Sequence, residues 1–85
     1  MISFLIRKII NFFEQDDVAY MCRVIASNKI RRSNRMYFLS NGMVIVFNHS
    51  FDTCIVKYKM DVVPLFIFMD EDSLGRIKQK LLEAE

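Results

Sequence analysis

The sequence predicts a small α+β domain in which an antiparallel β-sheet is packed against helices, in the order α-β-β-β-β-α. Three observations predict this class. Both ends of the chain have the 3.6-residue apolar periodicity of helices, the centre consists of short runs rich in β-branched and aromatic residues, and an Asn-Gly pair stands between two of those runs. The length of 85 residues predicts a single domain, residues 1–85, with a small core.

Residues 2–14 predict the first helix. Its polar residues form one stripe, whereas nearly all other positions are Ile, Leu or Phe. So wide an apolar surface exceeds what one face of a small sheet covers, and we therefore expect a homo-oligomer that uses it. An interfacial membrane helix is the alternative interpretation. Gln15-Asp16-Asp17 is expected to end this helix, and residues 18–26 then have the composition of a strand.

Residues 36–47 give the clearest local signal, which is a β-hairpin around Asn41-Gly42. This pair favours a two-residue type I′ turn, because both residues tolerate positive φ. Such a turn predicts a register in which Leu39 faces Val44, Phe38 faces Ile45, Tyr37 faces Val46 and Met36 faces Phe47. Since both faces of the hairpin are apolar, we expect it at the centre of the sheet, covered on each side or covered by a partner.

The remaining elements follow from alternation and from breaker residues. Residues 51–59 predict a strand with Cys54, Val56 and Tyr58 on one face and Thr53, Lys57 and Lys59 on the other. Pro64 cannot donate to a ladder, so residues 65–68 predict only a short edge strand. The acids from Asp70 onward begin a last helix. Its apolar stripe consists of Leu74, Ile77, Leu81 and Ala84.

The segment Lys29-Ile-Arg-Arg-Ser-Asn-Arg35 contains four cations and is expected to form a loop between the first two strands. The net charge is only +2, but residues 1–35 carry +4 and residues 70–85 carry −2, so the positive field is local. Because guanidinium groups bind phosphate oxygens in a bidentate manner, we expect the loop to bind RNA. A solvated turn and a contact with an acidic protein are the alternatives. The predicted RNA-binding residues are Lys29, Arg31, Arg32, Ser33, Asn34 and Arg35, extended by Lys57 and Lys59, with Tyr37 and Tyr58 as candidates for stacking on bases.

The sequence contains no candidate catalytic residue, metal-ligand set or cofactor motif, and we expect a protein that is not an enzyme. The sole histidine, His49, lies in an Asn-His-Ser turn. Cys22 and Cys54 fall in strand-like runs, which predicts buried, reduced thiols in a cytoplasmic protein. We expect neither a signal peptide nor a membrane-spanning helix.

In its compactness, its richness in Asn, Ile, Lys and Phe, and its single basic loop at residues 29–35, the chain resembles the TifA-type toxin inhibitors of T4-like bacteriophages. Those proteins counter a type III toxin–antitoxin endoribonuclease by binding the toxin together with RNA. The resemblance implies a non-catalytic counter-defence factor in the host cytoplasm, whose partners are RNA and a nuclease toxin or another host protein. A second hypothesis is a protein-only interaction module that docks on itself or on a host protein through its first helix or a hairpin face.

Overall fold

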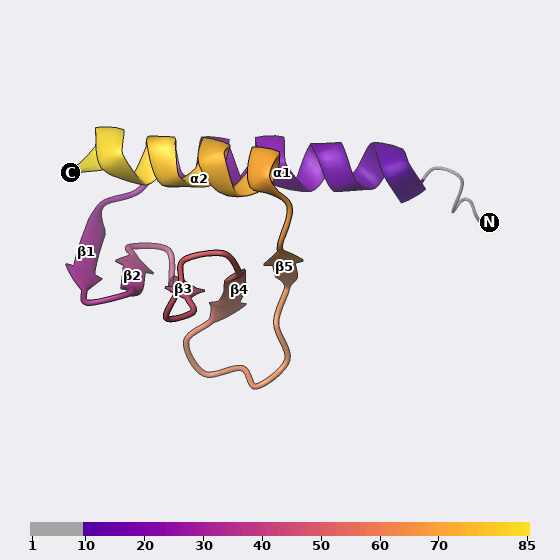
Figure 1. Ribbon diagram of the computed structural model, residues 1–85. Coiled ribbons are helices and arrows are strands. Elements are labelled where there is room, and N and C mark those ends of the chain that lie inside the picture. Colours follow the sequence, from indigo (N-terminus) through magenta and orange to yellow (C-terminus); the bar gives the residue numbers. More distant parts are fainter. Residues whose placement is uncertain (1–9) are drawn as a thin grey trace.

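The computed structural model describes residues 10–85, with side chains from residue 17 onward. These residues form two layers, a five-stranded antiparallel sheet and a pair of helices on one of its faces (Figure 1). Helix α1 (Ile10–Ser27) precedes the sheet and helix α2 (Glu71–Ala84) follows it. The strands, which lie in chain order across the sheet, are β1 (Ile30–Ser33), β2 (Met36–Leu39), β3 (Met43–Phe47), β4 (Cys54–Tyr58) and β5 (Phe66–Phe68). The predicted α+β class is confirmed.

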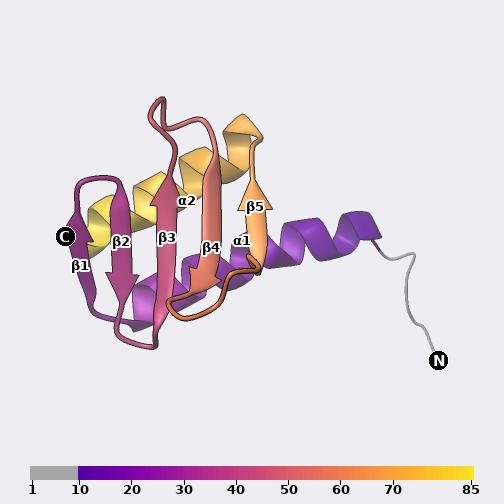
Figure 2. The same ribbon diagram turned by 90° about the horizontal axis from the view of Figure 1, so that it is seen from below.

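The core lies between the helices and the sheet. Both helices lie behind the sheet when the molecule is seen from the strand side (Figure 2), and they pack against each other. They contribute Val18, Met21, Cys22 and Ile25 from α1, and Leu74, Ile77 and Leu81 from α2. Alternate strand residues meet them, namely Tyr37, Leu39, Met43, Ile45, Phe47, Cys54, Val56 and Phe68. The opposite face of the sheet, called the outer face below, is not covered by any element of the described chain.

The prediction of a strand at residues 18–26 was wrong, because this segment is the second half of α1. Its buried residues recur at the helical spacing of three, four and seven positions, and this places all of them against the sheet. The predicted stop at Gln15-Asp16-Asp17 does not occur, since neither residue type imposes a backbone constraint as Pro or Gly does. Within the predicted first helix, residues 2–9 lie outside the described residues. The expected apolar interface on that helix is therefore not described either.

The basic segment is an edge strand with a tight turn rather than a loop. In β1, Arg31 faces Phe38 of β2 and Arg32 faces Tyr37. The turn that follows has a left-handed φ of 59° at Asn34, a conformation that asparagine tolerates better than most residues. Charged side chains on an edge strand also discourage pairing with other sheets. The cations are thus held by a strand ladder, and neighbouring arginines point to opposite faces of the sheet.

The hairpin of β2 and β3 is present, but its register differs from the prediction by one residue. Tyr37 faces Ile45 and Phe38 faces Val44, because the connection has three residues, Ser40 to Gly42, instead of two. Gly42 occupies the left-handed position with φ of 96°, as in three-residue hairpin loops that end in a bulge. The hairpin lies inside the sheet, with β1 and β4 on its two sides, as expected. Of the two kinds of cover that the sequence allowed, the described chain supplies one face only, through the helices (Figure 1), and cover of the other face by a partner stays a prediction.

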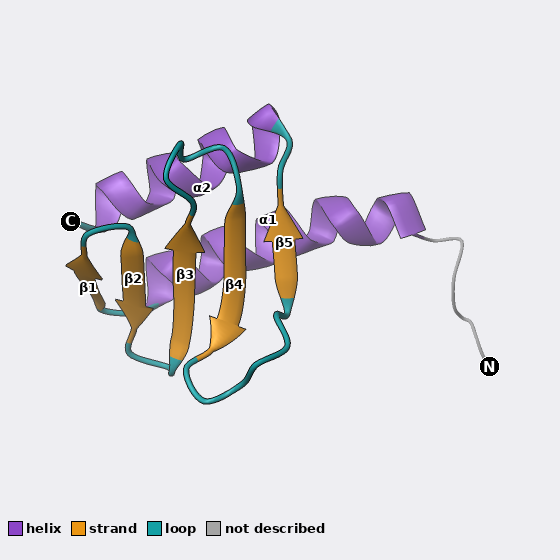
Figure 3. Ribbon diagram, turned by 60° about the horizontal axis from the view of Figure 1, so that its bottom comes forward, coloured by secondary structure: helices purple, strands orange, loops and turns teal. Residues whose placement is uncertain are grey.

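The C-terminal elements follow the prediction closely. Strand β4 alternates as expected in burying Cys54 and Val56, and β5 is a short strand at the edge of the sheet opposite β1 (Figure 3). Asp70 is the N-cap of α2 and accepts a hydrogen bond of 2.9 Å from the Ser73 backbone N–H. In the predicted stripe of α2, only Ala84 is exposed. No helix in residues 10–85 is both long enough and apolar enough to cross a membrane.

Candidate nucleic-acid interface

The outer face of the sheet consists of two cross-strand rows of different character. One row runs from β1 to β4 through Arg31, Phe38, Val44 and Lys57. The other, called the apolar row below, runs from β2 to β5 through Met36, Val46, Ile55 and Ile67. Neither row contains an acidic residue. The outer face is therefore positive at one end and apolar at the other.

Phe38 is the centre of the positive end. The Arg31 guanidinium carbon lies 4.6 Å from the centroid of its ring, and the Lys59 ammonium nitrogen lies 5.9 Å from it. Both distances are within the range of cation–π attraction, which places the two cations beside the same aromatic ring. Lys57 belongs to the same end, because it faces Val44 in the ladder. Val44 is buried without belonging to the core beneath the helices, so the side chains around it on the outer face cover it.

These cations are not neutralised inside the molecule. Arg31, Lys57 and Lys59, called the basic cluster below, form no ion pair with any residue of the described chain. A surface with several cations that are not paired with acidic side chains attracts anionic ligands.

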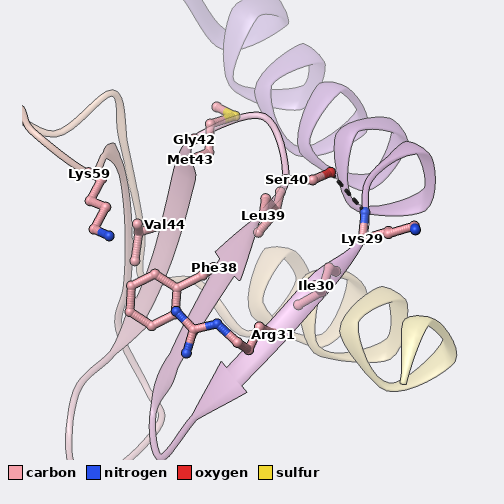
Figure 4. A pocket seen from close by; sticks show the side chains of 10 residues that line it. All are labelled: Lys29, Ile30, Arg31, Phe38, Leu39, Ser40, Gly42, Met43, Val44 and Lys59. Carbon is pink, nitrogen blue, oxygen red and sulfur yellow. Dashed lines mark hydrogen bonds between the residues drawn. The ribbon is translucent and has the colours of Figure 1, made fainter.

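A pocket of about 360 Å³ opens at this end of the sheet. Figure 4 shows the Arg31 guanidinium against the Phe38 ring and the Lys59 ammonium group turned toward that ring from the side of Val44, whereas the side chain of Lys29 points away. The rim is fixed by Ser40, whose hydroxyl accepts a hydrogen bond from the Lys29 backbone N–H and donates one to Asn28 Oδ1, both 3.0 Å long. These bonds join the end of α1 to the β2–β3 turn beside the pocket.

The structure divides the predicted RNA-binding residues between two faces. Arg32 lies on the helix side, where its guanidinium carbon is 5.3 Å from the Tyr37 ring and its Nη1 is 3.6 Å from Glu85 Oε2. Arg35 is partly buried in the turn, and its Nε is enclosed without a hydrogen-bond partner. Ser33 and Asn34 lie at the end of the β1–β2 hairpin that is remote from the pocket. Of the eight predicted residues, those brought together at the pocket are Lys29, Arg31 and Lys59, with Lys57 beside them.

Phe38 is the functional candidate that the sequence analysis missed. The two tyrosines proposed for stacking lie elsewhere, because Tyr37 is buried in the core and Tyr58, which faces Met43, belongs to the helix side of β4. The alternation of β2 was visible in the sequence, but both Tyr37 and Phe38 suit a buried position. The signal that identifies Phe38 is its pairing with Arg31, which requires β1 to be recognised as a strand.

The apolar row is more exposed than its composition would suggest. Met36, Ile55 and Ile67 have exposed fractions of 37%, 36% and 54%. The loop between β4 and β5 adds Met60, Val62 and Val63, which are more exposed still. Exposed apolar side chains on a sheet face are of the kind that marks a contact surface.

Other chemistry has little support among the described residues. The described His, Cys, Asp and Glu side chains do not gather into a group that could hold a metal ion. Cys22 and Cys54 are free and buried, as predicted, although Cys22 is helical. Burial raises the pKa of the Cys54 thiol to about 12, so it is protonated at neutral pH and is a poor nucleophile.

A scan of protein-family models found no match to this chain, and searches among curated proteins and solved structures found none either. The function therefore has to be inferred from the chemistry of the outer face.

Proposed function

We propose that the protein binds RNA through the basic cluster on its outer face and that it acts as a non-catalytic inhibitor of a nuclease toxin in the cytoplasm. The observation that carries this proposal is the placement of Arg31 and Lys59 around Phe38, beside two sheet rows that contain no acidic residue. RNA offers the two groups that such a surface binds, namely phosphates for the cations and base faces for the ring.

The inhibitory role comes from the resemblance to the TifA-type proteins. An inhibitor that binds toxin and RNA together needs a basic surface and a protein-binding surface in close proximity. The outer face offers a candidate for each, since the apolar row with Met36 and Ile55 adjoins the row that contains Phe38. The proposal requires no catalytic group, because occupying the RNA or the toxin is enough to stop cleavage.

The test is a salt titration of binding to a fluorescently labelled RNA. Each phosphate contact to a single strand contributes about −0.7 to the slope of log K against log salt, so the three cations of the basic cluster predict a slope of about −2. A variant with Arg31, Lys57 and Lys59 replaced by Gln should lose this binding. Its matched control replaces Arg76, Lys78 and Lys80 of α2, which changes the net charge equally on another element. Equal loss in both variants would show that net charge alone, and not the outer face, holds the RNA.

The inhibitory step has a separate assay. Bacterial cells that produce a type III toxin endoribonuclease should recover growth when they also produce the parent protein or the α2 control, but not when they produce the basic-cluster variant. If the basic-cluster variant protects as well as the parent, RNA binding is not part of inhibition.

A second candidate function is supported by the apolar row. In this alternative the protein is a protein-only module that forms a homo-oligomer or docks on a host protein, and binding is nearly independent of salt. Replacing Ile55 and Ile67 by Lys would then abolish association, which light scattering at micromolar concentration measures directly. A 10 kDa particle across that concentration range, for the parent protein, would contradict the homo-oligomer.

A further inference from the structure

We infer that the RNA bound by the outer face is single-stranded and that one unpaired base occupies the pocket beside Phe38, without selection of its identity. This inference rests on the proposed function and specifies its ligand.

The arrangement of the cations favours a single strand. The charged atoms of Arg31 and Lys59 lie 4.6 Å and 5.9 Å from one ring centre, so they converge on a point instead of following a line. Recognition of an RNA duplex by shape requires contacts to two strands across a minor groove, over about 16 base pairs in a typical module. A flexible single strand, in contrast, can place one base on the ring and its flanking phosphates on the surrounding cations.

The pocket has the surfaces on which an unpaired base stacks. The Arg31 guanidinium lies over the Phe38 ring, and unpaired bases stack on both kinds of plane. A base therefore either stacks on the guanidinium or takes its place on the ring. A volume of about 360 Å³ falls at the lower end of the range of small-ligand sites. Since Phe38 is the sole aromatic residue in the two outer rows, one base is held by stacking and its neighbours are not.

The same pocket lacks the groups that would read the identity of a base. Base reading requires hydrogen-bond donors and acceptors that are free to meet the Watson–Crick edge. The hydroxyl of Ser40, the side-chain hydroxyl at the rim, is already engaged with Asn28 Oδ1 and the Lys29 N–H. Arg31 and Lys59 are donors that any phosphate or base carbonyl satisfies. Stacking is tolerant of sequence, so we expect similar affinity for different bases.

The experiment compares three labelled probes at 0.1 M salt, which are a single-stranded RNA, the duplex formed with its complement, and inorganic polyphosphate. The parent protein should bind the single strand at least about tenfold more tightly than the duplex. Phe38→Leu keeps an apolar side chain but removes the aromatic plane, so it should weaken the single-stranded complex about tenfold and leave polyphosphate binding unchanged. Tyr20→Leu is the control, because it removes an exposed aromatic ring from α1 on the other side of the sheet, and it should change neither.

The outcomes separate the inference from the function on which it rests. Equal affinity for duplex and single strand, or a Phe38→Leu variant that binds RNA as the parent does, overturns the inference while RNA binding stands. Absence of salt-dependent binding to every probe overturns the proposed function and the inference with it. If Phe38→Leu fails to fold, photocrosslinking of the parent protein to 4-thiouridine RNA decides. Crosslinks should fall on the β2 peptide that contains Phe38, and crosslinks confined to other peptides would overturn the inference.

Discussion

Arg31 and Arg32 are neighbours in the chain but lie on opposite faces of β1, which makes them a matched pair for testing the outer face. Replacing either by Gln lowers the net charge from +2 to +1. Arg31 lies against Phe38 on the outer face, whereas Arg32 lies beside Tyr37 and Glu85 on the helix side. An effect of charge alone would be the same in both variants. If RNA binds on the outer face, only Arg31→Gln should weaken RNA binding.

The expected size of the difference follows from counterion release. If the three cations of the basic cluster each contact one phosphate of a single strand, the parent slope is about −2 and Arg31→Gln changes it to about −1.4. Affinity for RNA then falls about fivefold at 0.1 M salt, and the two binding curves converge toward 1 M salt. Arg32→Gln should leave the slope within error of the parent value. Its ion pair with Glu85 is exposed on both sides, so its loss should lower the free energy of unfolding by less than about 1 kcal/mol.

The measurement is fluorescence anisotropy of a labelled single-stranded RNA at four or more salt concentrations, with a thermal melt of each variant. The reasoning fails if Arg32→Gln reduces the slope as much as Arg31→Gln does. That result would mean that RNA follows the edge of β1 and not the outer face. If Arg31→Gln makes the slope less steep but also melts well below the parent, the change in slope reflects a folding defect.

Three further predictions concern stability and reactivity. Gly42→Val should lower the free energy of unfolding by about 1–2 kcal/mol, because φ is 96° there, and a variant that melts with the parent would contradict the turn. Gly75→Ala, in helix α2 with open space around it, should raise the free energy of unfolding by about 0.5–1 kcal/mol. Hydrogen bonds from Ser73 lower the pKa of Asp70. The stabilisation by this cap is therefore complete above the ordinary pKa of 3.8 and is lost as pH falls through the folded-state pKa. Asp70→Ala should lower the free energy of unfolding by about 1 kcal/mol at pH 7, and Asp70→Asn should remove the pH dependence while keeping the cap. Alkylation of Cys54 at pH 8 should proceed only as fast as the protein opens, and labelling of the native protein at the rate of a free thiol would show that β4 is not in the core.

The elements that the sequence predicted well are those in which one face is polar. In β4, Lys57 alternates with the small apolar residues Cys54 and Val56, and this fixed both the strand and its buried side. In α2 the acids at the start and the spacing of the apolar stripe fixed the helix and its cap. In both elements, burying the other face would bury charged side chains, so the sequence is compatible with only one buried face.

The elements that the sequence did not predict are apolar on every side or basic throughout. Residues 18–26 contain enough Val, Ile and Tyr for a strand, yet the helical spacing of Val18, Met21, Cys22 and Ile25 was also present, and packing against the sheet decided between the two periods. The register of β2 with β3 depended on one extra turn residue, Ser40, which no apolar pattern reveals. The basic segment was predicted as a loop, and without the ladder between β1 and β2 the separation of Arg31 from Arg32 could not be derived.

The composition of the outer face is itself an argument for a bound partner. An antiparallel sheet that is covered on one side usually has polar residues on its open side. Here Phe38, Val46, Ile55 and Ile67 occupy that side, and the exposed area of Ile55 and Ile67 contributes nothing to the stability of a domain that has a small core. Apolar side chains do not increase the solubility of a surface, and a purely hydrophobic interface does not require the basic cluster. A flexible strand offers both anionic phosphates and apolar base faces, and this supports the proposed nucleic-acid ligand at the Phe38 end.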